Sequence, residues 1–239
     1  MSNQASTPLR RVSILAIDRV FASTLMQAKD FFHLASLRYG KQLGHGLTPA
    51  FETRLVSPDG KPVNSFSDVV MPVDGGLENA DIIVLPAFWD DFDALCQRHP
   101  QVLSWLKQRH AAGSAICGEA TGVFWMAQAG LLDGKEATTY WRFFNEFAER
   151  FPKVIATSHL FDWDRDRLSA CGGLSVLDLL LAVLARDHGA ELAGAVSEEL
   201  VVERIREGGE RQRIPLQNRL GSSHPKLTQA VLLMEANIE

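Results

Sequence analysis

A sharp strand-to-helix turn in residues 115–135, AICGEATGVFWMAQAGLLDGK, is the feature of the sequence best suited to chemistry. Such a turn lifts one side chain into a cleft, where a serine or cysteine can act as a nucleophile. Ala120 stands at that position. Because a methyl group offers neither a hydroxyl nor a thiolate, we expect no covalent chemistry at this turn.

The thiols near this turn are the alternative nucleophiles. Cys117 lies in the predicted strand before Ala120, where a free cysteine is usually a small buried hydrophobe. A neighbouring loop would bring Cys171, in SACGG, to the pocket mouth, but its small apolar neighbours offer no cation that would lower its pKa. Cys96 falls on a predicted helix. Without a C-x-x-C pair or zinc-type histidine spacing, we predict no metal site and no cofactor.

Two acids follow predicted strands. Asp18 is either a ligand acceptor or a cap for the helix that comes next. Glu119 either projects into the same cavity as Ala120 and Thr121 or makes a structural hydrogen bond to the turn. Together the two carboxylates would make the pocket attractive to cations.

Aromatic pairs lie close to the same strand ends. Phe88 and Trp89 follow one strand, and Tyr140 and Trp141 follow the turn and its helix. With the acids, these rings would hold an amine or quaternary ammonium by cation–π attraction, worth about 0.5–2 kcal/mol per ring. The alternative is ordinary packing between helices and sheet.

The elements that position these residues alternate between strands and helices. Strand-like runs cover residues 12–17, 51–57, 81–86 and 114–118, with a hairpin within 61–73. Helical spacing covers 25–39, 91–112 with an interruption at Pro100, 122–129, 142–151, 174–188 and 190–200. This alternation predicts an α/β fold with a mainly parallel sheet and helices on both faces. Ligands then collect where the strands end, at Asp18, residues 86–89 and residues 119–121.

Composition limits the class of protein. Of 239 residues, 46% are hydrophobic and 22% are charged, as in globular proteins with a sizeable core. A net charge of −5 at pH 7 argues against a basic face for nucleic acid. The mixed-charge run 201–220 is interpreted as a solvated connection between domains. No secretory signal or membrane span is evident, and few cysteines are present, so we expect a cytoplasmic protein.

Several segments resemble a known family. ATGVFWMAQ, AGLLDGKEATTYWRFFNEFAERFPKV, SACGGLSVLDLLLAVLARDHGAELAGAVSEELVVERIREGG and HPKLTQAVLLMEANIE are similar to AraC-type transcriptional regulators. These regulators carry an N-terminal class I glutamine amidotransferase-like domain of the PfpI type. The resemblance implies a flavodoxin-like three-layer sandwich. Enzymes of that superfamily use a cysteine, a first-strand carboxylate and a histidine; the matching positions here are Ala120, Asp18 and Tyr140.

The resemblance also implies a domain organisation. Residues 1–10 are expected to form a flexible tail, 11–218 the amidotransferase-like sensor domain, and 219–239 a linker with the first helix of an otherwise missing helix-turn-helix domain. DNA would be bound only through that domain, and two-fold operators favour a homodimer.

The favoured function is a ligand-sensing and dimerisation domain that has lost the catalytic cysteine. Because related regulators respond to nitrogenous metabolites, the effector implied is an amine or similar compound. Two alternatives remain. One is a PfpI-like hydrolase, amidase or glyoxalase that uses Cys117 or Cys171. The other is a structural dimerisation module without a ligand.

Overall fold

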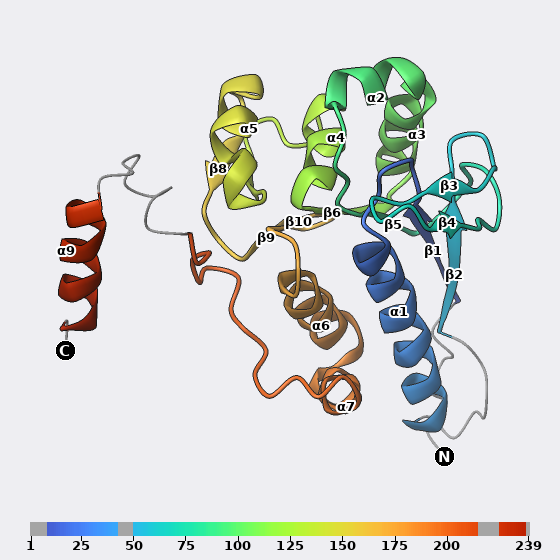
Figure 1. The fold of residues 1–239 in the computed structure, drawn as a ribbon. Coiled ribbons are helices and arrows are strands. Elements are labelled where there is room, and N and C mark those ends of the chain that lie inside the picture. The colour runs from blue at the N-terminus through green and yellow to red at the C-terminus, as the bar shows by residue number, and fades with distance from the viewer. Residues whose placement is uncertain (1–8, 43–49, 215–224, 238–239) are drawn as a thin grey trace.

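A six-stranded sheet forms the centre of the molecule in a computed structural model that describes residues 9–42, 50–214 and 225–237 (Figure 1). The strand order is β2-β1-β5-β6-β10-β9, in which the first five strands are parallel and β9 is antiparallel to β10. The bounds are β1 Arg10–Leu15, β2 Phe51–Val56, β5 Ile82–Leu85, β6 Ala115–Glu119, β9 Phe161–Asp164 and β10 Arg167–Ala170. The predicted flavodoxin-like α/β architecture is confirmed.

Helices cover both faces of the sheet (Figure 1). One layer contains α1 (Ala22–Gln42), α6 (Ser175–His188) and α7 (Ala190–Glu199); the other contains α2 (Phe92–Arg98), α3 (Pro100–Ala111) and α4 (Val123–Gln128). All four residues of β5 are buried, which explains its uninterrupted apolar run. Pro100 separates α2 from α3 as predicted, because proline suits the first turn of a helix.

Smaller elements surround this sandwich. The predicted hairpin is the antiparallel pair β3 (Val63–Asn64) and β4 (Val70–Met71). A parallel pair, β7 (Glu136–Thr138) and β8 (Ile155–Thr157), supports α5 (Phe144–Arg150). Near the end of the chain, α9 covers Pro225–Ala236. None of the described helices is both long and apolar enough to cross a membrane.

Candidate functional site

The turn after β6 has the geometry of a nucleophile elbow. Ala120 begins a short 3-10 helix, Ala120–Gly122, and has a φ of 49°, in the left-handed region that is unfavourable for residues with a Cβ. Thr139 Oγ1 donates a hydrogen bond of 2.8 Å to the carbonyl oxygen of Ala120. Ala120 therefore lies in a strained bend that its surroundings hold in place.

Close backbone contacts fix the elbow against neighbouring strands. A Cβ on Gly122 would lie 1.9 Å from the carbonyl oxygen of Leu85 at the end of β5. A Cβ on Gly172, which has a φ of 100°, would lie 2.8 Å from the Cβ of Ala120. Only glycine fits at either position. The loop after β10 therefore closes directly over the elbow.

Thr121 joins the elbow to the segment after β5. Its Oγ1 accepts a hydrogen bond of 2.8 Å from Phe88 N and donates one of 2.7 Å to Phe88 O. Phe88 in turn forms a β-bridge with Val20, which follows β1. The three strand ends expected to converge therefore do so.

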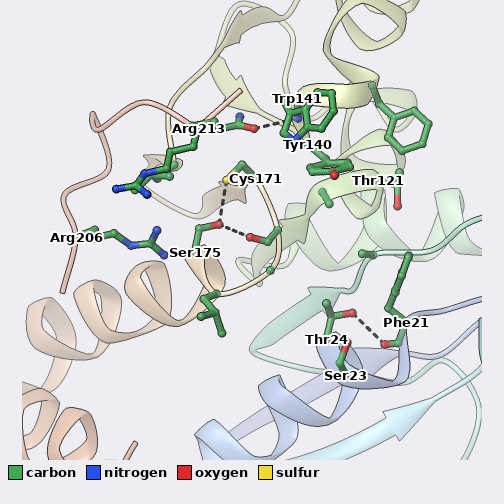
Figure 2. Close-up of a pocket in the computed structure, with 18 of the residues that line it drawn as sticks. Phe21, Ser23, Thr24, Thr121, Tyr140, Trp141, Cys171, Ser175, Arg206 and Arg213 are labelled. Carbon is green, nitrogen blue, oxygen red and sulfur yellow. Dashed lines mark hydrogen bonds between the residues drawn. The ribbon is translucent and has the colours of Figure 1, made fainter. Parts of the chain in front are cut away.

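A cavity of about 840 Å³ lies above Ala120 (Figure 2). One side consists of aromatic rings and the other carries guanidinium groups. Figure 2 shows Phe21 on one side of the cavity and Arg206 and Arg213 on the other. The rings are Phe21, Phe66, Phe88, Trp89, Tyr140, Trp141 and Phe143, and the arginines are Arg204, Arg206, Arg211 and Arg213. This volume suits a small metabolite.

Residues 201–213, here called the strap, form the arginine side of the cavity. Arg206 pairs with buried Asp178 of α6: Nη2 lies 2.6 Å and Nε 2.9 Å from Oδ2, and the backbone N donates to Oδ1 at 2.8 Å. Residues 201–213 are therefore more than a solvated connection, and residues 215–220 of the predicted run lie outside the described residues. Buried Asp178 requires a cationic partner, and the strap provides it.

Gln212 fixes the far end of the strap. Its Oε1 accepts from Trp141 N at 2.9 Å, and its Nε2 donates to Thr139 O at 2.9 Å and Thr138 Oγ1 at 3.0 Å. Because Gln212 is buried, each of these bonds would be costly to lose. The strap is therefore attached to the loop that carries the aromatic residues Tyr140 and Trp141.

Comparison with known proteins identifies the family. The HTH-type transcriptional regulator ArgR of Pseudomonas aeruginosa is 74% identical over 134 residues, which are 56% of this chain and 41% of that protein. The regulator GbdR of the same species is 30% identical over 95% of this chain and 60% of its own length. CdhR is 34% identical over 79% of this chain and 56% of its own length. The chain is homologous to these HTH-type transcriptional regulators. It spans between 41% and 60% of the length of these relatives.

Solved structures support the fold of this regulator chain. An AraC family regulator from Pseudomonas putida superposes with a TM-score of 0.69 at 24% identity, over 80% of this chain and 99% of that one. A ThiJ/PfpI family protein from Pseudomonas syringae superposes with a TM-score of 0.68 at 16% identity, over 99% of this chain and 93% of that one. No family model matches the chain.

Most of the predicted site residues meet in the cavity of the regulator. Phe88, Trp89, Ala120, Thr121, Tyr140 and Cys171 line it, whereas Asp18 and Glu119 do not. The two carboxylates therefore do not make the cavity attractive to cations, and that expectation is corrected. Among the residues that the structure describes, the only acid in the lining is Glu210 of the strap, which pairs with Arg204 at 2.8 Å.

Asp18 has a structural contact. Its Oδ1 accepts a hydrogen bond of 2.9 Å from the backbone N of Asn64 in β3. Helix α1 begins only at Ala22, and Asp18 makes no capping bond to it among the described residues. The carboxylate therefore attaches the β3–β4 hairpin to the end of the first strand, which neither proposed role anticipated.

Glu119 lies inside the protein core. Its side chain is fully buried, and neither carboxylate oxygen has a hydrogen-bond partner within the described residues. The alternative of a structural hydrogen bond to the turn is therefore not supported. Burial raises the pKa of this carboxyl well above its ordinary value of 4.5, because an ion is poorly solvated in the core. Glu119 is therefore protonated in the folded protein at pH values where the unfolded chain carries an anion.

This difference predicts that the contribution of Glu119 to the stability of the domain falls as pH rises. Above pH 4.5 the unfolded chain releases the Glu119 proton and the folded chain retains it, so the free energy of unfolding falls by up to about 1.4 kcal/mol per pH unit. Glu119→Gln should remove this dependence and be the more stable form at pH 8. Urea unfolding at pH 5 and pH 8 measures the effect. Glu191→Gln, at an exposed position, is the control, and an unchanged pH slope in Glu119→Gln would refute the assignment.

All three thiols have raised pKa values. Burial raises the pKa of Cys117 well above 9.0, and it raises that of Cys96 to about 11. Cys171 Sγ donates to Ser175 Oγ at 3.2 Å, and burial raises its pKa as well. The expectation that no cation lies near Cys171 is wrong, because the charge of Arg206 lowers this pKa in part. Burial has the larger effect.

The strap residues were missed by sequence reasoning. Arg206, Arg211 and Gln212 belong to an irregular segment far along the chain from the elbow. The only signal was Asp178, an acid within the apolar run GGLSVLDLLLAVLA. A buried acid predicts a cationic partner, but the sequence offers many arginines and does not say which one is used.

Proposed function

We propose that residues 11–218 form the ligand-sensing and dimerisation domain of a transcriptional regulator, and that the cavity above Ala120 is the ligand site. The observation that carries the proposal is an elbow retained with its strain, a φ of 49°, although its summit is a methyl group. Strain of this kind persists at functional sites because the surroundings enforce it. Ala120 cannot act as a nucleophile. We infer that the strained elbow instead serves to shape the floor of the cavity.

The cavity walls indicate the chemistry of the ligand. Tyr140, Trp141 and Phe21 offer ring faces to an amine or quaternary ammonium. Across the cavity, Arg211 and Arg213 have no carboxylate partner within the described part of the chain, and both suit an acidic group. A small nitrogenous metabolite with an acidic end would satisfy both walls.

Ligand binding would act through the strap. Hydrogen bonds to Asp178 and from Gln212 hold the strap in one arrangement. A ligand that contacts Arg211 or Arg213 would change the stability of this arrangement relative to others. Differential affinity for two arrangements of a homodimer would then shift how helix-turn-helix domains are held on DNA. Residues 219–239 would form the linker and first helix of such a domain.

A thermal-shift screen tests the proposal. The probes are small amines, a betaine and amino acids, each added in large excess to the chain. A ligand present at 100 times its Kd stabilises the folded state by about 2.7 kcal/mol, so at least one probe should raise Tm by several degrees. If no probe raises Tm, the assignment of ligand chemistry is wrong.

Thiol labelling tests the alternative, a cysteine-dependent hydrolase, amidase or glyoxalase. Because burial raises the pKa of Cys117 and of Cys171, both should react with iodoacetamide at pH 7.5 at least about tenfold more slowly than in urea-unfolded chain. Mass spectrometry of the labelled peptides gives the rates. A thiol that reacts faster in the folded protein than in the unfolded control would favour the enzyme.

A further inference from the structure

Three side chains outside the cavity lie close together and are of the types that coordinate metal ions. Glu136 begins β7, His159 lies between β8 and β9, and Asp162 is in β9. One ligand atom from each lies within 4.8 Å of the other two. The spacing in the sequence predicted no metal site, because the three residues are brought together only by the pairing of short strands.

Two of the three side chains are already held in place. Asp162 Oδ1 lies 2.7 Å from His159 Nδ1, and its Oδ2 accepts a hydrogen bond from Thr157 Oγ1. The side chain of Asp162 is only 9% exposed. His159 is fixed through its backbone as well, since its carbonyl oxygen accepts from Thr138 Oγ1 at 2.7 Å. The contact from Thr157 is of the kind that orients a metal ligand from outside the set.

The charges of the set are not balanced. Glu136 has no hydrogen bond or ion pair within the residues that the structure describes, yet its carboxylate lies beside that of Asp162. The nearest lysine in the sequence, Lys135, pairs with Asp164 instead, at 2.6 Å. The two adjacent carboxylates repel each other when both are ionised. A divalent ion would offset this repulsion.

We propose that Glu136, His159 and Asp162 bind a divalent transition-metal ion. One imidazole and two carboxylates suit Zn²⁺ or Co²⁺ better than Ca²⁺ or Mg²⁺, which prefer oxygen ligands. Three protein ligands leave a position for water. His159 would bind as the neutral imidazole, and Thr157 would keep Asp162 oriented.

The site lies where the strap pairs with the rest of the domain. His159 forms a β-bridge with Arg211, and its carbonyl oxygen accepts from Gln212 Nε2 at 3.2 Å. An ion held by His159 therefore stiffens the loop on which the strap rests. This site is independent of the ligand cavity, and it stands whether or not the proposed sensing function is correct.

Metal titration tests the proposal on the full chain after dialysis against a chelator. Calorimetry with ZnCl₂ should show one equivalent bound, and CoCl₂ should give visible absorption bands of a coordinated ion. Glu136→Gln should weaken the affinity for Zn²⁺ by about tenfold or more. This variant changes an exposed side chain without a hydrogen bond in the described structure, so it should fold normally.

His110→Gln is the matched control, because His110 pairs with a single acid, Asp166, at 3.1 Å and has no third ligand. It should bind Zn²⁺ as the original chain does. The proposal is overturned if the chain binds no Zn²⁺ at one equivalent, if Glu136→Gln binds as tightly as the original chain, or if His110→Gln loses affinity equally.

Discussion

Replacing Gly122 by alanine should cost about 4 kcal/mol or more of unfolding free energy, a large part of the stability of an ordinary domain. The added Cβ would lie 1.9 Å from the carbonyl oxygen of Leu85, 2.8 Å from its carbonyl carbon and 2.9 Å from the carbonyl oxygen of Pro86. These are backbone atoms at the end of a fully buried strand. They cannot rotate away as a flexible side chain would, so either β5 or the elbow must move.

Gly194→Ala is the matched control for this change. Gly194 lies inside α7, and a Cβ there meets no atom within 4 Å. Alanine should stabilise the helix by about 1 kcal/mol, because glycine loses more backbone entropy on folding. Urea unfolding of both variants separates the effect of the steric clash at Gly122 from the general effect of replacing glycine by alanine in a helix. A midpoint for Gly122→Ala equal to that of the original chain would show that the elbow is not packed against β5.

The sequence predicted the central strands well because they are buried on both faces. Continuous apolar runs such as IIVL predict buried strands. The helices between them have clear apolar spacing. The strands β9 and β10, FDWD and RLSA, were missed, as were β7 and β8. Each has only three or four residues and mixes polar with apolar side chains, so pairing partners rather than local sequence determine them.

The rule of strand ends predicted part of the cavity lining, and it did not predict the strap. Phe88, Ala120 and Thr121 follow strands and do line the cavity. Glu119 also ends a strand, but successive side chains of a strand point to opposite faces, and its own is buried away from the cavity. The strap carries no regular pattern, and its place depends on the pairing of Arg206 with Asp178.

Replacing Ala120 by leucine should weaken ligand binding at least about 100-fold, or about 2.7 kcal/mol. Ala120 forms the floor of the cavity, and its Cβ already faces Gly172 closely. A branched side chain at this summit would therefore extend into the space that a ligand needs. The reason is steric, so the loss should be similar for every probe that binds. Thermal unfolding of the variant tests whether the fold is retained.

Ala111→Leu is the control, since Ala111 is exposed at the end of α3, outside the cavity lining. The most direct measurement is a calorimetric titration of the original chain and both variants with the probe that raises Tm most. We predict one bound probe per chain for the original and for Ala111→Leu, and at least about 100-fold weaker binding for Ala120→Leu. Equal affinity in Ala120→Leu and the original chain would contradict a ligand site above the elbow.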